Sequence, residues 1–271
     1  MSLVLVLVEP AGPLNVGSVA RLCANFGISQ LRLVAPRCDH LGPEARRMAV
    51  HGGGLLEQAA LFPRLSDALA DCRRVVATSG RIEQESLPLA PVAEALTWLR
   101  QGSTPAGDQT TGNPSAHDAN AADAPGALVF GREDRGLSND ELLQAGRVVR
   151  LSTGPAYSSL NLSHAVAICL HELQSLQTHQ PGRVLRPAPE DTAGVSSEPG
   201  SDPCTRSALE STLTDAEALL LEVGFLYPHT AHARMAKLRA LLQRAQITDP
   251  EVALLRGMVR QLRWAAQRGT P

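Results

Sequence analysis

The chain has 271 residues, enough for one large domain or two modest ones, and its 44% hydrophobic content is ordinary for a water-soluble protein. The net charge of −2 excludes a strongly acidic or basic protein as a whole. Five scattered cysteines without a C-x-x-C pair argue against a disulfide framework or a zinc site. The run LVLVLV is too short for a secretion signal or a membrane span, so we expect a cytoplasmic protein without a membrane partner.

Short apolar runs alternate with helical segments along the first two thirds of the chain. The predicted strands are Leu3–Val8, Leu31–Ala35, Arg74–Thr78, Ala127–Phe130 and Val148–Leu151. The first run is apolar at every position, which is typical of a strand buried on both faces and therefore of a parallel sheet. The alternation predicts an α/β fold with a mostly parallel sheet.

The helices between these runs carry recognisable boundary residues. We expect one helix to begin with Asn15 as its N-cap and to end at Gly27. Two or three short helices should follow between Pro43 and Leu69, and a further helix should cover residues 91–100. Ser138 and Glu141 have the spacing of a capping box, and a long apolar helix should end near residue 178.

Two low-complexity stretches divide the chain. Residues 102–126 contain hardly any apolar side chain larger than alanine, which predicts a disordered insertion in a domain of residues 1–178. Residues 179–205 read as a flexible linker. The remaining residues, 206–271, predict a helical C-terminal extension with helices at 207–223, 231–245 and 249–268, and residues 231–271 hold eight basic side chains against two acidic ones.

Three loops follow predicted strands and carry small polar residues. They are TSGR (Thr78–Arg81), GREDRGL (Gly131–Leu137) and LSTGPAYSSLN (Leu151–Asn161). Ligands of open parallel sheets collect at the carboxyl ends of strands, and glycines there let a ligand approach the backbone. Any one loop could equally hold turn glycines and helix caps, but three together predict a binding site.

Other motifs point to weaker alternatives. HGGG (His51–Gly54) is similar to the oxyanion-hole motif of serine hydrolases, but no G-x-S-x-G occurs, so we interpret it as a flexible break between helices. G-x-G-x-x-G and G-x-x-x-x-G-K-[ST] are both absent. His164 and His171 lie near one helix face without a third ligand, so we predict no metal. Arg21, taken alone, would be an ordinary surface arginine.

Taken together, the segments resemble one enzyme class. NVGSVAR (Asn15–Arg21), LVFGREDRGLSNDEL (Leu128–Leu142) and LSTGPAYSSLNLSHAV (Leu151–Val166) resemble the three motifs of the SPOUT-class RNA 2′-O-ribose methyltransferases. The segment from Glu222 to Leu262 is similar to the tail of the TrmJ-like branch of that class. This branch methylates the ribose of cytidine or uridine 32 in the tRNA anticodon loop.

The resemblance implies a SPOUT-type fold with a C-terminal trefoil knot, a homodimer, and S-adenosylmethionine as the cofactor. It implies cofactor contacts at Thr78, Ser79, Gly80, Gly131, Leu151, Ser158, Ser159 and Leu160. It implies catalytic-site positions at Asn15, Arg21, Glu133, Ser159 and Asn161. The resemblance also implies that the arginine comes from the other subunit. It implies that the long helix after Asn161 packs across the dimer interface, which would place His164 and His171 there.

The chemistry assigns roles to these residue types. An arginine stays protonated, so Arg21 is expected to bind a substrate phosphate and polarise the 2′-hydroxyl rather than to act as the base. In the basic tail, Lys237, Arg239 and Arg244 are expected to contact tRNA, although a solvated helix face would look the same. The alternatives are a catalytically idle RNA-binding protein of the same class and a serine hydrolase.

Overall fold

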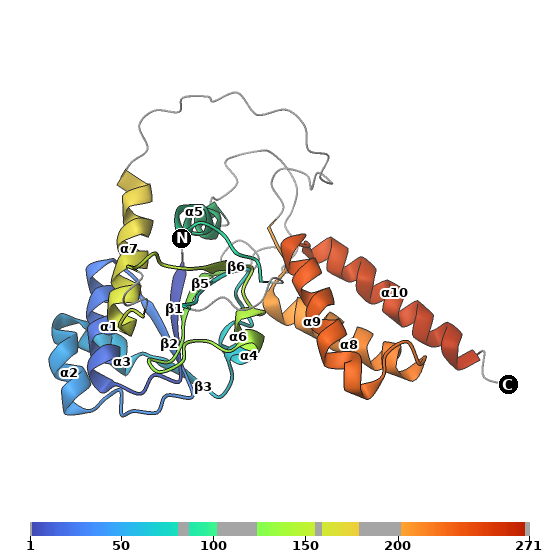
Figure 1. Cartoon of the computed structure of the whole chain (residues 1–271), viewed down its shortest axis with the longest axis horizontal. Helices are drawn as coiled ribbons and strands as arrows, with labels where there is room; N and C mark the ends of the chain where they lie inside the picture. The colour runs from blue at the N-terminus through green and yellow to red at the C-terminus, as the bar shows by residue number, and fades with distance from the viewer. Residues whose placement is uncertain (1, 81–86, 102–123, 155–158, 179–201, 269–271) are drawn as a thin grey trace, which may run out of the picture.

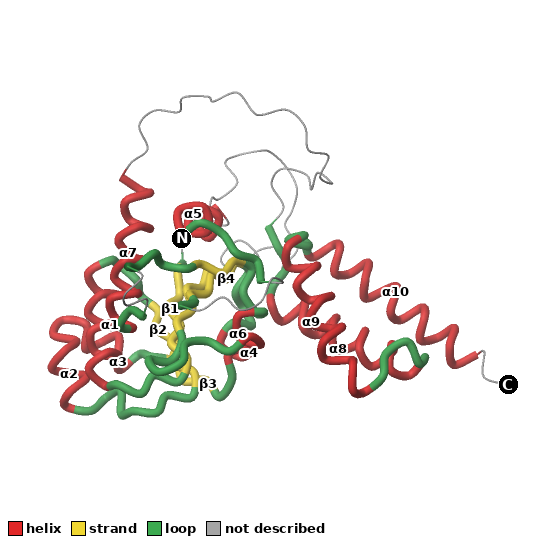
Figure 2. Tube along the Cα trace, viewed as in Figure 1, coloured by secondary structure: helices red, strands yellow, loops and turns green. Residues whose placement is uncertain are grey.

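The structure is a computed structural model that describes residues 2–80, 87–101, 124–154, 159–178 and 202–268. The sheet in this part of the chain has six strands: β1 (Leu3–Val8), β2 (Gln30–Val34), β3 (Ala60–Phe62), β4 (Arg74–Thr78), β5 (Gly126–Phe130) and β6 (Arg147–Val149). Their order is β3-β2-β1-β5-β4-β6, and every neighbouring pair is parallel. The predicted α/β fold with a parallel sheet is confirmed (Figure 2).

Helices cover both faces of the sheet. The helices that pack with the sheet are α1 (Pro13–Asn25), α2 (Pro43–Ala49), the 3₁₀ turn η1 (Val50–Gly52), α3 (Gly53–Glu57), α4 (Leu65–Ala68), α5 (Val92–Gln101), α6 (Asn139–Leu142) and α7 (Leu162–Thr178). The sheet and these helices are called the core below. Leu3, Leu5 and Leu7 of β1 pack in one apolar cluster with α1, α5 and α7. The alternate residues Val4, Val6 and Val8 pack in a second cluster with α4 and α6. The strand is buried on both faces, as its apolar run predicted.

Three local predictions differ from the structure. Helix α1 begins at Pro13 with Gly12 as its N-cap, because the fixed φ of proline suits the first helical turn. Asn15 is therefore inside the helix, and its side chain is free to bond elsewhere. Strand β3 was expected to be helical, and β5 begins at Gly126, inside the predicted insertion. Most of that insertion, residues 102–123, lies outside the described residues.

Glycines set the distance between α1 and the helices beside it. A Cβ on Gly17 would lie 2.2 Å from the carbonyl oxygen of Ala45, and one on Gly52 would lie 2.6 Å from that of Ala20. No side chain larger than hydrogen fits at either contact. Gly52 belongs to the HGGG segment, which is therefore a packing contact against α1 rather than a flexible break.

Three further helices extend from the core: α8 (Arg206–Glu222), α9 (Pro228–Arg244) and α10 (Asp249–Arg268) (Figure 1). Arg73, the residue before β4, donates to the carbonyl of Pro203 at 2.6 Å and to Asp249 at 2.9 Å. Trp98 of α5 donates to the side chain of Gln246 at 2.9 Å. The last residues of the predicted linker, 202–205, are thus bonded to the core.

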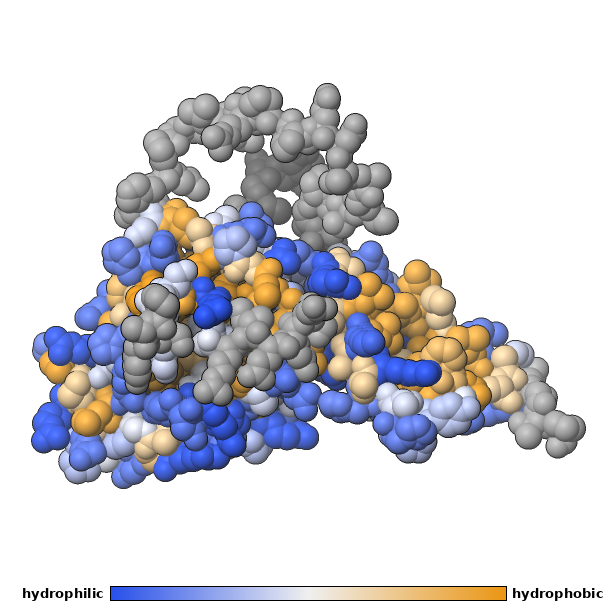
Figure 3. Space-filling view, in the orientation of Figure 1, coloured by the Kyte–Doolittle hydropathy of each residue, from blue (hydrophilic) through white to orange (hydrophobic). Residues whose placement is uncertain are grey.

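The exposed surface of these helices is partly apolar. Figure 3 shows hydrophobic side chains gathered on the part of the molecule that holds them. The exposed apolar residues there include Phe225, Tyr227, Leu254, Met258 and Leu262. In the part of the chain that the structure describes, no helix is both long enough and apolar enough to cross a membrane.

Candidate active site

A cavity of about 510 Å³ lies at the carboxyl ends of β4 and β5. It is lined by the loops after β4, β5 and β6 and by the beginning of α7. Thr78 at the end of β4 also donates its hydroxyl to the carbonyl of Val129 on β5, at 3.3 Å. The position agrees with the general rule for ligand sites in parallel sheets.

The cavity collects most of the predicted cofactor contacts. The predicted residues that line it are Thr78, Ser79, Gly80, Gly131, Leu151, Ser159 and Leu160. Ser158 lies outside the described residues. These positions are up to 82 residues apart in the sequence and come from all three predicted loops.

A hydrogen-bonded chain of side chains joins the three motifs beside this cavity. The carboxylate of Glu133 accepts bonds from the backbone N–H groups of Ala11 and Gly12, both at 3.0 Å, and from the Asn15 amide at 3.1 Å. The Asn15 oxygen in turn accepts from the Asn161 amide at 3.0 Å. Of the predicted catalytic residues, Asn15, Glu133 and Asn161 are therefore in one network, and Ser159 lies on the cavity wall.

Asn161 also fixes the beginning of α7. Its side-chain oxygen accepts from the backbone N–H of Ser163 at 2.9 Å and from the Ser163 hydroxyl at 2.8 Å, as an N-cap residue does. One asparagine thus orders the first turn of α7 and contacts α1.

The environment of Glu133 keeps its carboxylate ionised. Partial burial alone would raise its pKa, but the hydrogen bonds from Ala11, Asn15 and Gly12 outweigh that effect and lower the pKa below the ordinary glutamate value. A carboxylate with three donors in place is a poor proton acceptor. Its contacts favour a positioning role over that of a general base.

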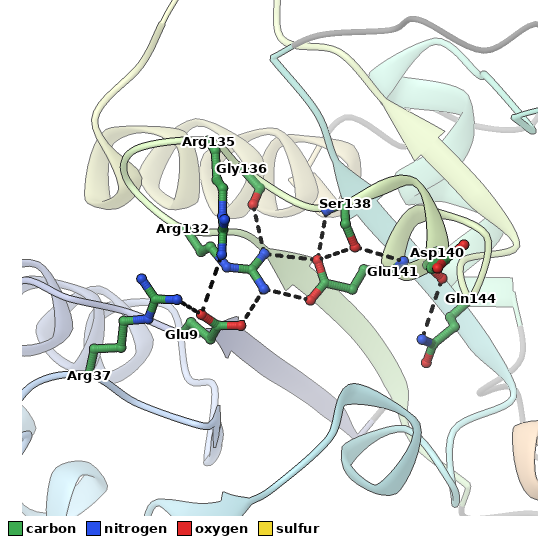
Figure 4. A network of polar contacts seen from close by, with 9 residues as sticks. All are labelled: Glu9, Arg37, Arg132, Arg135, Gly136, Ser138, Asp140, Glu141 and Gln144. Carbon is green, nitrogen blue, oxygen red and sulfur yellow. Dashed lines mark hydrogen bonds and ion pairs between the residues drawn. The ribbon is translucent and has the colours of Figure 1, made fainter.

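A second network, which the sequence did not reveal, holds the loop after β5 (Figure 4). The buried guanidinium of Arg132 forms an ion pair with Glu9 and a bidentate pair with Glu141, at 2.9 and 3.0 Å. Glu141 also accepts from the backbone N–H and the hydroxyl of Ser138, which confirms the predicted capping box. The hydrogen bond from Arg132 is the main reason that the pKa of Glu9 lies below its ordinary value. The sequence shows that Arg132 is a charged residue within the GREDRGL motif, but it gives no signal that its partners are Glu9 and Glu141.

Gly131 is required where this loop turns back on itself. A Cβ there would lie 2.3 Å from the carbonyl carbon of Gly136 and 2.4 Å from the nitrogen of Leu137. The backbone N–H of Gly136 donates to the carbonyl of Arg132 at 3.0 Å, and Gly136 has a φ of +71°. The two glycines therefore allow a narrow turn beside the cavity.

Arg21 is not part of this site within one subunit. It lies on α1, is exposed, and is absent from the cavity wall. Six residues separate it from Asn15, so the two side chains leave the helix in different directions. Leu14, seven residues before Arg21, lies on the same face of α1 and is 45% exposed.

The predicted RNA-binding residues of the tail differ from one another. Lys237 and Arg244 are exposed on α9. Arg239 is instead bound to Glu210 of α8 through two hydrogen bonds, at 2.8 and 2.9 Å. Its charge is compensated within the protein, so Arg239 is a less suitable phosphate contact than its two neighbours.

The alternative motifs find no counterpart at the cavity. None of the residues of the HGGG segment lines it. Within the described residues there is no group of three or more histidine, cysteine or acidic side chains that could hold a metal ion.

Comparison with known proteins identifies the family. Residues 2–171 match the model of the SpoU rRNA Methylase family. The chain belongs to this family. Residues 207–271 match the model of the tRNA methyltransferase TrmJ C-terminal domain.

Relatives are similar over nearly the whole chain. A protein of Pectobacterium atrosepticum named tRNA (cytidine/uridine-2′-O-)-methyltransferase TrmJ is 34% identical, with 94% of each chain covered. A Pseudomonas aeruginosa protein named tRNA (cytidine/uridine/adenosine-2′-O-)-methyltransferase TrmJ is 30% identical over 97% of this chain and 94% of its own.

A solved structure shares the architecture. The crystal structure of TrmJ from Z. mobilis ZM4 superposes with a TM-score of 0.74 at 26% identity, and the match covers 96% of this chain and 98% of that one.

Proposed function

We propose that the protein transfers a methyl group from S-adenosylmethionine to the 2′-hydroxyl of cytidine or uridine 32 in tRNA. The observation that carries the proposal is that the loops after β4, β5 and β6 line one cavity, and that every described residue expected to bind the cofactor lies on its wall. The first motif is bonded to this site through Asn15, which contacts Glu133 and Asn161. The names of both relatives support tRNA as the substrate and a ribose 2′-hydroxyl as the acceptor. The name of the Pectobacterium atrosepticum relative supports a pyrimidine nucleoside, and that of the Pseudomonas aeruginosa relative adds adenosine.

The residues around the cavity fit the cofactor. Among the described residues, and leaving out its chain neighbours, no atom lies within 4 Å of where a Cβ on Gly80 would be, so the backbone there is open to a ligand. Thr78, Ser79 and Ser159 would supply hydroxyl groups, and Gly131, Leu151 and Leu160 would supply backbone and apolar contacts. S-adenosylmethionine, when bound, supplies an electrophilic methyl group on a sulfonium.

The remaining polar residues would align the acceptor. Methyl transfer is an in-line displacement, so the ribose oxygen must be held in a fixed direction. The chain of hydrogen bonds from Glu133 through Asn15 to Asn161 fixes the loop after β5, the beginning of α1 and the beginning of α7 relative to one another. In this proposal Glu133 is a positioning residue, and Ser159 faces the reactants.

Arg21 would act in the cavity of a second subunit. It shares a face of α1 with the exposed Leu14, and the adjacent helix α7 exposes Ile168, His164 and His171. These features support a homodimer in which α1 and α7 pack against the partner. There Arg21 would bind a substrate phosphate and polarise the 2′-hydroxyl.

The C-terminal residues 206–271 would form an RNA-binding extension of the domain at 1–178. Lys237 and Arg244 support this part of the proposal, because exposed basic side chains give salt-dependent affinity for phosphates. A tRNA substrate also fits the expected cytoplasmic location.

Titration calorimetry with S-adenosylhomocysteine tests the proposal, with wild type compared to Arg21→Ala. We expect both proteins to bind it equally well, because Arg21 is not on the cavity wall of its own subunit. The variant should lose methyl transfer to tRNA by about a hundredfold or more, as expected for a lost transition-state contact. Failure of the wild type to bind would refute the cofactor assignment, and full turnover by the variant would refute the role of Arg21.

A further inference from the structure

A cluster of arginines surrounds Glu9 beside the cavity (Figure 4). Glu9 directly follows β1, and its carboxylate forms ion pairs with Arg37 and Arg132. Arg135 lies close as well, with its Nη2 atom 3.9 Å from Glu9 Oε2. Three guanidinium groups therefore share one carboxylate.

The three arginines are not equivalent. The side chain of Arg132 is only 8% exposed, and it also bonds to Glu141 and to the carbonyl of Gly136. Both of its Nη atoms are bonded within the protein, which suits a structural role, and only its buried Nε has no hydrogen-bond partner among the described residues. The side chains of Arg37 and Arg135 are 49% and 61% exposed and have only Glu9 as an acidic partner among the described residues.

These two exposed arginines come from loops on either side of Glu9. Arg37 lies three residues after the end of β2, and its backbone N–H donates to the carbonyl of Pro10 at 2.9 Å. Arg135 lies in the loop after β5 and lines the cavity. Both arginines approach the same oxygen, Oε2 of Glu9, so the Arg37 guanidinium lies beside that of Arg135 at the rim of the cavity.

The backbone at this rim is strained. Glu9 has a φ of +45°, and Ala35, before Arg37, has a φ of +42°, although neither residue is glycine. Each is held by a bond to the neighbouring strand: Glu9 N–H donates to Val34 at 2.7 Å, and Ala35 N–H donates to Phe62 at 2.8 Å. Such conformations cost free energy and concentrate at functional sites. Here they direct the chain that carries Glu9 and Arg37 at the ends of two adjacent strands.

We propose that Arg37 and Arg135 bind a backbone phosphate of the tRNA near the ribose that is methylated. The inference rests on the proposed function. A guanidinium binds phosphate oxygens with charge-assisted, directional hydrogen bonds. The side chains of Arg37 and Arg135 are exposed enough for a bound RNA to contact them where they lie. Glu9 holds both side chains at the rim while no RNA is bound. Asp134 also lines the cavity, so recognition depends on the directed guanidinium groups rather than on a large positive field.

The test measures binding of a tRNA transcript with cytidine at position 32 to full-length protein saturated with S-adenosylhomocysteine, over a series of salt concentrations. The variants are Arg37→Ala, Arg135→Ala and the double variant. Each single substitution should weaken tRNA binding about tenfold, as for one lost charge-assisted bond, and lower the slope of log K against log salt by about 0.7 to 0.9. Arg135→Lys should recover part of the affinity, because lysine still binds phosphate as a point charge.

Arg100→Ala is the matched control. Arg100 is partly exposed near the end of α5. The carbonyl of Trp98, two residues earlier, accepts a hydrogen bond from Arg74 at the beginning of β4. Arg100 therefore lies toward the amino ends of the strands, whereas the cavity lies at their carboxyl ends. Its loss should leave tRNA affinity unchanged. Affinity for S-adenosylhomocysteine, measured by calorimetry, should stay within about twofold in Arg37→Ala and Arg100→Ala, because neither residue lines the cavity. Arg135 does line it, so in Arg135→Ala the loss of tRNA affinity should exceed any loss of cofactor affinity.

Two results would overturn the inference. One is a double variant with wild-type tRNA affinity and salt slope. The other is an equal loss of affinity for tRNA and for S-adenosylhomocysteine, which would mean that the substitutions only disturb the loop. If the wild type itself does not bind tRNA, the proposed function falls as well, so the two failures are distinguishable.

Discussion

Glu133 illustrates how one side chain can organise a site without reacting. Its carboxylate is the acceptor for two backbone N–H groups at the beginning of α1 and for the Asn15 amide. A hydrogen bond to an ionised group contributes about 1.5 to 3 kcal/mol. The loop after β5 and the first turn of α1 are therefore coupled through this residue.

We expect Glu133→Gln to lower the free energy of unfolding by about 2 kcal/mol at neutral pH, because one oxygen is replaced by a donor that faces other donors. The folded pKa of Glu133 lies below its ordinary value, so its stabilisation is complete above the unfolded pKa of about 4.3 and is lost as the pH falls through the folded pKa. The difference between wild type and variant should therefore shrink in acid.

Urea denaturation at neutral and acidic pH measures this difference. Glu57→Gln is the control, since Glu57 is a 57% exposed partner of Arg46 and should change stability little. A Glu133→Gln variant as stable as wild type at neutral pH, or one whose deficit does not depend on pH, would contradict the assignment.

At the residue scale, the sequence predicts side-chain contacts correctly when both partners lie close together in the chain. The capping box of Ser138 and Glu141 follows from their spacing, because both partners lie within one helical turn. The pair of Glu9 and Arg132 joins residues 123 positions apart, and no periodicity encodes it. Asn15 was wrongly expected to cap α1, since Pro13 starts the helix two residues earlier.

At the scale of elements, α1 packs closely against its neighbours because glycines without side chains lie at the contacts. Gly52 of η1 touches α1 at Ala20 and Arg21, where an added Cβ would lie 2.6 and 2.9 Å from backbone atoms. The neighbouring Gly53 has helical backbone angles and open space around the Cβ position. The two glycines therefore offer a matched pair of substitutions.

Gly52→Ala should destabilise the protein by about 1 to 3 kcal/mol through overpacking and should reduce methyl transfer, because it displaces the helix that carries Arg21. Gly53→Ala should stabilise it by about 0.5 to 1 kcal/mol, because alanine is the better helix former. Calorimetric melting and a methyl-transfer assay measure both. Equal effects of the two substitutions would show that the contact with α1 is unimportant.

The elements that the sequence predicted well were long or fully apolar. The five predicted strands all exist, because continuous apolar runs mark doubly buried strands. β1 and β4 have the predicted bounds, and the ends of the other three differ by one or two residues. Strand β3 was missed because it has three residues, lies at the sheet edge and is largely exposed, so it shows no burial pattern. HGGG was misread because close packing and flexibility both favour glycine.

At the scale of the whole molecule, polar contacts join the C-terminal helices to the core. Arg73 and Arg74 of the core bind Asp249 and Asp202 at 2.9 and 3.1 Å. The guanidinium groups of Arg74 and Arg147 both lie over the Trp98 ring, each 5.2 Å from its centroid. Composition predicted a helical basic extension but not this junction, because its partners lie more than 100 residues apart.

The central claim is that the cavity and its three motifs methylate one ribose of tRNA. Its most direct test is methyl transfer from isotope-labelled S-adenosylmethionine to two tRNA transcripts that differ only at position 32, cytidine in one and 2′-deoxycytidine in the other. We predict label in the first transcript alone, on the ribose of nucleotide 32. Equal label in both transcripts would contradict the assigned acceptor, and no label in either would contradict the activity.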